Sequence, residues 1–211
     1  MRNNAENYGW QNADAPCSCS FVAPQIIRLL KRLEVMSVVD VGCGNGALCG
    51  ILQKSGFRVI GVEYDKKGCE LAREANPDVP FYNLGVYDSP TPITDAEGGY
   101  FDCVVSTEVV EHLYSPQCLP VFAGQLLIPG GYLIISTPFH GYLKNLAVSL
   151  LNHWDSHHTA LWEGGHIKFW SRKTLTALLK QSGFRVVGFY GVGRIPFLWK
   201  SMILVAQKVQ P

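Results

Sequence analysis

Hydrophobic runs and segments of helical spacing alternate along most of this chain. Apolar residues in short runs predict strands at 37–42, 57–65, 79–86, 101–107 and 132–138. Helical spacing predicts helices from about Ser20 to 34, over 46–56, over 66–76 and in the first part of 116–131. The segment 91–100 is expected to be a loop. Strands that alternate with helices imply right-handed crossovers, and hence a parallel sheet covered by helices on both faces.

The end of the chain departs from this alternation. A helix is expected to begin at Ser171 and to end at Gly183, and two strands follow at 185–193 and 200–209. Their connection, which contains Pro196, is short, so the two strands should form an antiparallel pair. The predicted fold is α/β: one domain over 1–211 with a doubly wound, seven-stranded, mostly parallel sheet whose last strand is antiparallel.

An insertion at 139–170 separates the fifth strand from the last helix. It holds five of the six histidines and three of the five tryptophans of the chain. Ligand sites in open α/β sheets lie beyond the carboxyl ends of the strands, and the fifth strand delivers the insertion to that edge. We therefore predict that the insertion covers a substrate.

Composition and charge narrow the class of partner. The chain has 211 residues, 47% of them hydrophobic, which suits one α/β domain with a full core. Eighteen Lys and Arg against 17 Asp and Glu leave a net charge of +1, which gives no electrostatic case for a nucleic-acid partner. No signal peptide and no apolar run of membrane-spanning length is seen. The seven cysteines lack metal or redox spacing, so reduced thiols in a cytoplasmic protein are expected.

The stretch VVDVGCGNG, at 38–46, places Gly42, Gly44 and Gly46 on alternate residues where the first strand ends. A strand that turns sharply into a helix leaves the first backbone N–H groups of the helix unpaired, which suits an anionic ligand. Dinucleotide-binding sequences share such a turn, but they space their last two glycines three apart. The spacing here disfavours a nicotinamide cofactor. Glu63, which ends the second strand, fits ribose hydroxyls in either case.

These segments resemble the class I S-adenosylmethionine-dependent methyltransferases. VVDVGCGNG looks like their first motif and VIGVEYD like the acidic one after it, while FDCVVSTEVVEHL and LLIPGGYLIISTP resemble their fourth- and fifth-strand motifs. Within the class, the E-x-x-E-H run and the GHIKFWS segment most resemble the ubiquinone-biosynthesis O-methyltransferases of the methyltransferase type 11 group. The resemblance implies a Rossmann-like methyltransferase fold and S-adenosylmethionine as cofactor.

The resemblance also implies where the cofactor binds. The N–H groups of Gly44 and Gly46 would donate hydrogen bonds to its methionyl carboxylate, and Glu63 would accept hydrogen bonds from its two ribose hydroxyls. Val86 stands where the family commonly has an acid for the adenine amino group, with Asp88 two residues later. Thr107 lies where the fourth strand opens beneath the sulfonium. The full predicted set for the cofactor is Asp40, Gly42, Gly44, Gly46, Glu63, Tyr64, Val86 and Thr107.

Methyl transfer from an activated sulfonium needs alignment, and an oxygen nucleophile must also lose its proton to a base or beside a metal. Glu108, Glu111 and His112 match positions that the ubiquinone O-methyltransferases associate with a divalent metal such as Mg²⁺. The alternative is that these acids only stabilise a helix start. His166, in GGHIKFW, is the candidate general base because a histidine pKa lies near neutrality, with His112 as second choice. A histidine that only stabilises a lid is the alternative.

Several further features stay open at this stage. His157 and His158 are weaker candidates, and Trp154, Trp162 and Trp170 line either an aromatic substrate slot or a lid core. The apolar segment 142–154 packs on the sheet edge by default, or rests on a membrane or a lipid-soluble substrate. Tyr8 and Trp10 suggest a flap over the cofactor within residues 1–19.

The predicted function is methyl transfer from S-adenosylmethionine to an oxygen of a small molecule, with an aromatic acceptor as one option. The rivals are an N-methyltransferase acting on a small amine or sugar, a nicotinamide-dependent oxidoreductase, and a non-catalytic cofactor-binding module. The sequence names neither the acceptor nor the oligomeric state.

Overall fold

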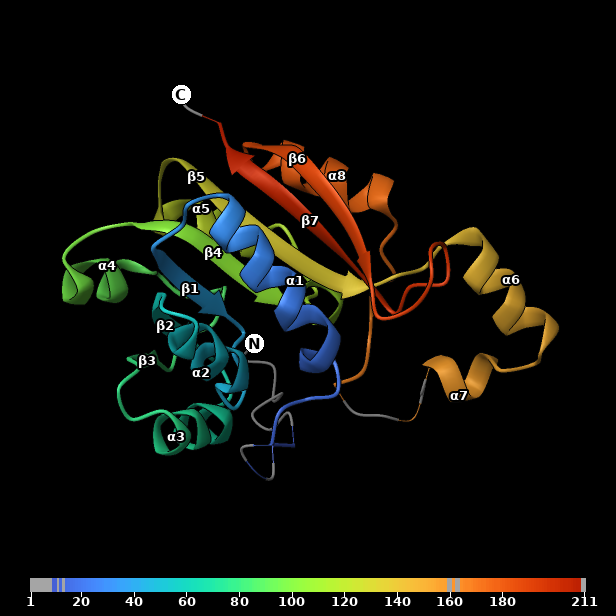
Figure 1. The fold of residues 1–211 in the computed structure, drawn as a ribbon, viewed down its shortest axis with the longest axis horizontal. Coiled ribbons are helices and arrows are strands. Elements are labelled where there is room, and N and C mark those ends of the chain that lie inside the picture. Colours follow the sequence, from blue (N-terminus) through green and yellow to red (C-terminus); the bar gives the residue numbers. More distant parts are fainter. Residues whose placement is uncertain (1–8, 11, 13, 159–160, 162–163, 210–211) are drawn as a thin grey trace.

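The strands form one seven-stranded sheet in the computed structural model, which describes residues 9, 10, 12, 14–158, 161 and 164–209 (Figure 1). The order across the sheet is β3-β2-β1-β4-β5-β7-β6. Strands β1 to β5 are parallel to one another, and β7 is antiparallel to both β5 and β6. The predicted sheet with an antiparallel last strand is therefore confirmed. Its strands are β1 (Ser37–Val41), β2 (Arg58–Val62), β3 (Phe81–Tyr82), β4 (Phe101–Thr107), β5 (Leu127–Pro138), β6 (Phe184–Val192) and β7 (Ser201–Lys208).

Helices cover both faces of this sheet, which places the hydrophobic core in two layers. One layer joins the sheet to α1 (Cys19–Arg32), α2 (Ala47–Lys54) and α3 (Lys66–Ala75). The other joins it to α4 (Thr91–Glu97), α5 (Cys118–Leu126) and α8 (Arg172–Gln181). Helix α8 begins where the sequence predicted, because Ser171 and Thr174 form a reciprocal capping box.

Two local predictions are wrong. Segment 91–100 contains helix α4 instead of a loop, since prolines at its first positions are compatible with a helix start and Gly98, with a φ of 70°, ends it. The third strand keeps only two residues of the predicted 79–86. The chain leaves the sheet at Asn83, whose amide group donates to the carbonyl oxygens of Glu63 and Tyr64, both at 2.9 Å.

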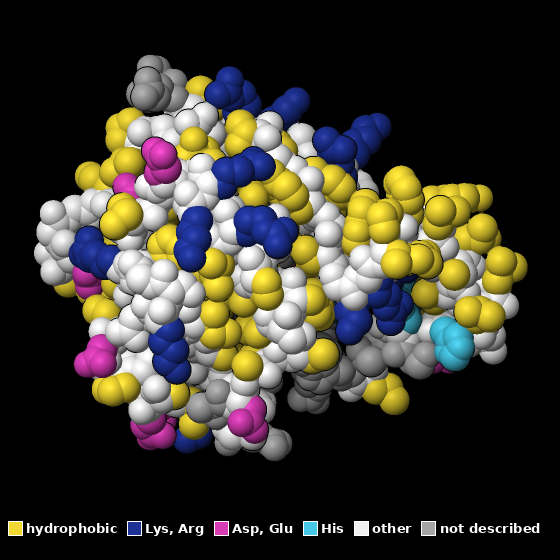
Figure 2. All heavy atoms as spheres, in the orientation of Figure 1, with side chains coloured by type: hydrophobic (Ala, Val, Ile, Leu, Met, Phe, Trp, Pro, Cys, Tyr) yellow, Lys and Arg dark blue, Asp and Glu magenta, His cyan; other side chains and the backbone are white. Residues whose placement is uncertain are grey.

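The insertion forms an arm that carries α6 (Tyr142–Leu150) and α7 (Trp154–His158) away from the sheet (Figure 1). The default prediction, that 142–154 packs on the sheet edge, is wrong for most of it, because Lys144 is the only buried residue of α6. Hydrophobic side chains gather on the arm (Figure 2). The exposed ones are Tyr142, Leu143, Leu146, Leu150, Leu151 and Trp154. None of the described helices is both long and apolar enough to cross a bilayer.

Candidate functional site

A cavity of about 480 Å³ opens at the carboxyl ends of β1, β2 and β4. This is the edge at which open α/β sheets bind ligands. Seven of the eight predicted cofactor residues line the cavity, and Gly46 is the exception. The seven are Asp40, Gly42, Gly44, Glu63, Tyr64, Val86 and Thr107.

The turn between β1 and α2 requires glycine for two reasons. Gly42 and Gly44 have φ values of 77° and 56°, a left-handed conformation that side chains disfavour. Neighbouring side chains also occupy the space that a Cβ would fill, namely Val109 against Gly42 and the ring of Trp10 against Gly44. Glycine at these two positions therefore lets Val109 and Trp10 pack directly against the backbone of the turn.

The backbone amides of this turn are already paired, which corrects one prediction. The Gly44 N–H donates to Oε2 of Glu63 at 2.6 Å, and the Gly46 N–H donates to the Cys43 carbonyl at 3.0 Å. Gly44 and Gly46 thus offer no unpaired amides to a methionyl carboxylate in this structure. The turn predicted from the glycines exists, but its amides hold the turn and the neighbouring Glu63 in place.

Glu63 is held in place by both loops that border the cavity. Its Oε1 accepts from the N–H of Asp65 at 2.8 Å, while Oε2 accepts from Gly44. Burial raises the pKa of Glu63, and the two backbone hydrogen bonds oppose that rise. A carboxylate oxygen has two lone pairs, so each oxygen can accept a further hydrogen bond from a hydroxyl group. Glu63 is therefore fixed in position at the cavity, with lone pairs that can accept from a ligand hydroxyl.

Asp40 is a buried acid with one unsatisfied oxygen. It is 1% exposed, and its Oδ2 accepts from the Sγ of Cys49 at 3.4 Å. Its Oδ1 has no hydrogen-bond partner among the described residues. Burial raises the pKa of Asp40 to about 7. A cationic ammonium group in the cavity, such as that of a methionyl moiety, would satisfy this oxygen, so the residues present fit such a cofactor.

Asp40→Asn should stabilise the ligand-free protein at about pH 8 and weaken its response to S-adenosylhomocysteine. The pKa of Asp40 is raised on folding, so the folded protein binds this proton more tightly than the unfolded chain does. The cost of ionising Asp40 is thus absent below about pH 4, grows up to about pH 7 and persists above it. Asn removes that cost, and it also removes the negative charge that a ligand ammonium needs.

Melting curves of both proteins between about pH 4 and pH 8, with and without S-adenosylhomocysteine, measure both effects. The exposed acid of Asp95→Asn provides the control. Two results together would contradict this role of Asp40. Asp40→Asn would melt at a lower temperature than the parent at the alkaline end, and S-adenosylhomocysteine would raise its melting temperature as much as that of the parent.

Leu84, Gly85 and Val86 line the part of the cavity that the sequence assigned to adenine, and none of the three is an acid. Asp88 does not line the cavity; its Oδ2 accepts from the Gly85 N–H at 2.7 Å and so stabilises the turn. Backbone groups and apolar contacts thus form this end of the cavity.

Three metal-binding side chains meet beside the cavity. Ligand atoms of Glu111, His112 and His166 all lie within 4.8 Å of one another, and the two imidazole centroids are 4.9 Å apart. Glu111 is 1% exposed, yet neither of its carboxylate oxygens has a hydrogen-bond partner among the described residues. Burial and the carboxylate of Glu108 raise its pKa well above the usual value. A buried, unsatisfied carboxylate is costly, and a cation is the partner that removes the cost.

The two imidazoles are placed by a loop of the insertion. Nδ1 of His112 hydrogen-bonds with the Gly164 carbonyl at 2.7 Å; the neutral ring then donates from Nδ1 and carries its lone pair on Nε2. Backbone N–H groups of Ile167 and Lys168 both donate to the Glu111 carbonyl at 3.0 Å, and His166 lies next to them in the chain. A hydrogen bond from one ring nitrogen to a backbone carbonyl, as His112 makes, is typical of histidines that bind a metal through the other nitrogen.

Two of the earlier assignments change with this geometry. Glu108 lies outside the cluster, because its Oε1 accepts from Ser136 at 2.7 Å and its Oε2 from Ser201 at 3.3 Å. It lines the cofactor cavity with a φ of 55°, which is strained for a glutamate. Burial and the neighbouring histidines lower the pKa of His166 to about 4, so the expected pKa near neutrality is wrong. A neutral imidazole is a poor base at that pKa but a suitable ligand.

The remaining candidates of the insertion lie on the arm side of the site. His157 and His158 are half-buried and lie near His140, with centroids 6.2 and 6.0 Å from its ring. The Trp154 ring contacts His158 with centroids 4.2 Å apart, whereas Nε1 of Trp170 donates to the Val110 carbonyl at 3.3 Å. Trp162, like Tyr8, lies outside the described residues.

The segment before α1 also lines the cavity, within residues 1–19, where the sequence suggested a flap from Tyr8 and Trp10. The amide group of Asn45 donates to the carbonyls of Asn12 and Asp14, at 3.0 and 2.8 Å, and this fastens the segment to the glycine turn. Pro16, Ser18 and Cys19 contribute to the cavity without any motif that could have identified them.

The fold and the site together define a Rossmann-like S-adenosylmethionine-dependent methyltransferase: a glycine turn after β1, an acid ending β2, a cavity above them and an antiparallel last strand. The profile of the family described as Methyltransferase domain matches residues 16–188. The chain belongs to this family. Membership of this family does not favour the alternative function, a nicotinamide-dependent oxidoreductase.

Relatives of known activity agree with this class. The chain is 28% identical over 195 residues to the ubiquinone biosynthesis O-methyltransferase of Roseobacter denitrificans, covering 87% of this chain and 77% of that protein. It is 29% identical over 203 residues to the protein of the same name from a Ruegeria strain, covering 89% and 78% of the two chains.

Solved structures share the fold. Magnesium protoporphyrin IX methyltransferase from Synechocystis, with bound S-adenosylhomocysteine, superposes with a TM-score of 0.63 at 18% identity, covering 89% of this chain and 81% of that one. The methyltransferase domain of bacterial CtHen1 gives a TM-score of 0.66 at 20% identity, covering 90% and 97%. At these identities the likeness concerns the fold alone.

Proposed function

We propose that the protein transfers the methyl group of S-adenosylmethionine to a hydroxyl oxygen of a small aromatic acceptor with neighbouring hydroxyls, of catechol type. The observation that carries the proposal is the cluster of Glu111, His112 and His166 at the border of the cofactor cavity. His112 belongs to both, since it also lines the cavity. The names of the relatives support an oxygen acceptor over the amine or sugar alternative.

A divalent metal held by these three residues would lower the pKa of an acceptor hydroxyl and fix its oxygen. The residues fit one: a buried carboxylate without a hydrogen bond, and two imidazoles of which one is oriented through a backbone carbonyl. Two imidazoles in the set favour Mn²⁺, Fe²⁺ or Zn²⁺ over the Mg²⁺ expected from the sequence, because Mg²⁺ prefers oxygen ligands.

The other residues of the cavity position the cofactor. Glu63 would accept hydrogen bonds from the ribose hydroxyls and Asp40 would pair with the methionyl ammonium, at a cavity that Thr107 also lines. Alignment of this kind supplies much of the rate, since the sulfonium is already activated. Trp10 packs on the glycine turn and lines the cavity. Contact of 142–154 with a membrane stays a prediction.

Chelation followed by metal addition tests the proposal. The purified protein should methylate a catechol with S-adenosylmethionine, lose this activity in excess EDTA and regain it with Mn²⁺, Fe²⁺ or Zn²⁺ more than with Mg²⁺. Bound metal, measured by elemental analysis before and after chelation, gives a readout that is independent of turnover. Full activity in a protein shown to be free of metal would reject the metal-assisted proposal.

A further inference from the structure

The sheet ends at β6, a strand of nine residues whose outer edge has no neighbouring strand among the described residues (Figure 1). Strand β7 pairs with its inner side from Phe184 to Val192. Outside this pairing, no backbone hydrogen bond between described residues involves 184–191. The opposite edge of the sheet is much shorter, because β3 has only two residues. An unpaired edge of the length of β6 presents a row of N–H and C=O groups to which another extended chain can bind.

A groove with a volume of about 600 Å³ lies beside this edge, between β6 and α8. We call it the α8–β6 groove, and its lining residues are Arg172, Lys173, Thr176, Ala177, Lys180 and Val186. The five helix residues recur at intervals of four, so they share one flank of α8. Leu175 and Leu179, on the other flank, are buried in the core. Because β6 is the last strand, the groove opens at the end of the sheet.

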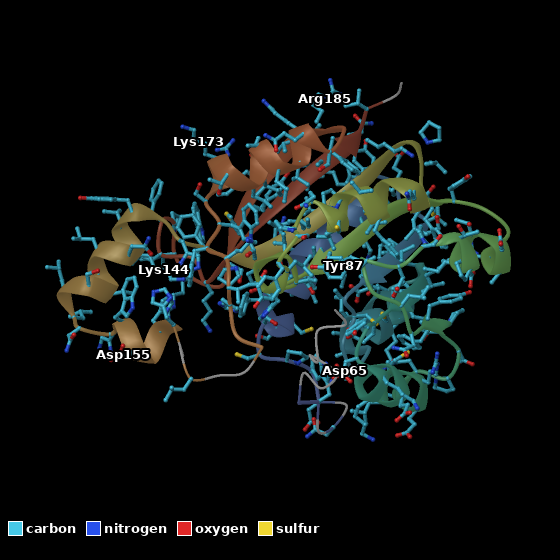
Figure 3. All side chains as sticks on the ribbon, turned by 180° about the vertical axis from the view of Figure 1, so that it is seen from behind. Asp65, Tyr87, Lys144, Asp155, Lys173 and Arg185 are labelled. Carbon is cyan, nitrogen blue, oxygen red and sulfur yellow. The ribbon has the colours of Figure 1, made fainter. Side chains whose placement is uncertain are left out.

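The α8–β6 groove is basic. Arg172, Lys173 and Lys180 are exposed, and the ion pairs found among the described residues include none of the three. The bordering elements α8, β6 and β7 contain no Asp or Glu. The side chains of Lys173, on α8, and Arg185, near the start of β6, point outward at this end of the sheet (Figure 3).

This basic surface reflects an uneven distribution of charge along the chain. Residues 112–211 carry nine Lys and Arg against two acids, whereas residues 1–111 carry nine against fifteen. The strands β5, β7 and β6 all come from the second part and lie together at one end of the sheet. The topology therefore separates charges that nearly cancel in the net charge of +1.

The edge of β6 also offers apolar contacts. A bulge shifts the register with β7 between Val186 and Gly188, so Val187 has no paired residue in β7. The side chain of Val187 is 45% exposed. Val186 and Ala177 line the groove between the cations. A chain that extends along β6 would therefore meet both apolar and cationic side chains.

Charge decides which kind of chain fits this edge. Two copies of β6 placed side by side would bring Lys173, Lys180 and their counterparts together, and like charges oppose such pairing. An acidic chain gains charge pairs and backbone hydrogen bonds at once. An anionic membrane would pair with the cations but would leave the N–H and C=O groups of the edge without partners.

We propose that the outer edge of β6 and the α8–β6 groove bind an extended acidic segment of another protein by strand addition. Main-chain hydrogen bonds along the edge supply affinity, and the groove selects a segment in which acidic and apolar residues alternate. This interaction surface is separate from the cofactor cavity, since no residue lines both. The inference does not depend on the proposed methyl transfer.

Three fluorescein-labelled peptides test the inference. The first has the sequence EVEVDVE, the second is KVKVKVK, and the third is the first peptide methylated at every backbone nitrogen. Fluorescence anisotropy at about 50 mM salt, where exposed charges are weakly screened, should show saturable binding of the first peptide below about 1 mM. The other two should bind at least about 10-fold more weakly, because one reverses each charge pair and the other cannot donate backbone hydrogen bonds.

Variants of α8 locate the binding surface. The double variant Lys173→Glu, Lys180→Glu should weaken binding of the acidic peptide by about 10-fold or more. Lys54→Glu, at an exposed lysine of α2, should bind it as the parent does. Melting curves check that each variant folds, and the neutral pair Lys173→Gln, Lys180→Gln replaces the double variant if it does not.

Hydrogen exchange followed by mass spectrometry shows where the acidic peptide binds. The peptide should slow exchange in β6 and leave β3, the other edge, unchanged. This result together with the charge dependence supports the proposal.

Several outcomes overturn the proposal. These are no saturable binding up to about 1 mM, equal binding of the acidic and lysine peptides, unchanged binding by the α8 variant, or unchanged exchange in β6. If the methylated peptide binds as tightly as the first, the surface attracts anions without strand pairing, and the proposal is again overturned. Binding and exchange are measured without turnover, so a failure of the proposed function leaves these results intact.

Discussion

Glu111→Gln should lower kcat by roughly 10²–10⁴-fold, the range expected when the step that removes the acceptor proton loses its support. Glu111 is the only carboxylate of the cluster with His112 and His166, and it lies nearly fully buried without a hydrogen-bond partner among the described residues. Gln keeps the shape but loses the negative charge that a divalent cation needs. Bound metal should fall together with kcat, while affinity for S-adenosylmethionine should stay within about 2-fold of the parent.

Stability separates this role from a structural one. An unpaired buried carboxylate destabilises a protein, so the metal-free Glu111→Gln protein should melt no lower than the metal-free parent. Glu74→Gln, at an exposed residue of α3, is the matched control. If Glu111→Gln retains full activity and metal content, the cluster has no part in the reaction. A lower melting temperature with normal metal binding would assign Glu111 to folding instead.

Glu63→Ala should weaken binding of S-adenosylmethionine by about 2–3 kcal/mol, or roughly 30–150-fold, as for lost hydrogen bonds to a charged group. The carboxylate joins the glycine turn to the loop after β2 through Gly44 and Asp65, and its remaining lone pairs face the cavity. The substitution therefore removes ribose contacts and also loosens the turn that forms the floor of the cavity.

Calorimetric titration with S-adenosylmethionine, well below the melting temperature of the variant, measures this loss. Asp78→Ala, at an exposed acid, should bind as the parent does. NAD provides the cofactor control, because it should stabilise neither protein. Unchanged affinity in Glu63→Ala would show that another group holds the ribose.

Most residues that line the cavity could be predicted from the sequence because they are local to the ends of the strands. Gly42 and Gly44 follow β1 directly and Glu63 follows β2, and parallel neighbours bring their carboxyl ends to one edge. The prediction that the amides of Gly44 and Gly46 are unpaired was wrong, because both are hydrogen-bonded within the protein. The pairing of Gly44 with Glu63 spans nineteen positions of sequence and depends on the side-chain conformation of the acid.

Local patterns also explain which elements were predicted well. Strand β4 has the predicted bounds, because seven consecutive residues fit a buried strand between a loop and the site. Strand β3 was predicted too long and α4 was missed. Alternating polarity cannot show that Asn83 binds two carbonyls of the neighbouring loop, and prolines near 90 fit a turn as well as a helix start.

By itself the sequence determined the α/β class, the order of its elements and the cofactor-binding edge, since each follows from hydrophobic period and local turn chemistry. Only the tertiary structure decided the acceptor side. Backbone hydrogen bonds from Ile167 and Lys168 to Glu111 bring His166 close to His112. The carboxylate of Glu108 instead accepts hydrogen bonds from Ser136 and Ser201. The hydrogen bonds to Glu111 and His112 join segments more than fifty residues apart, and loop conformation, which no local pattern encodes, determines which side chains meet there.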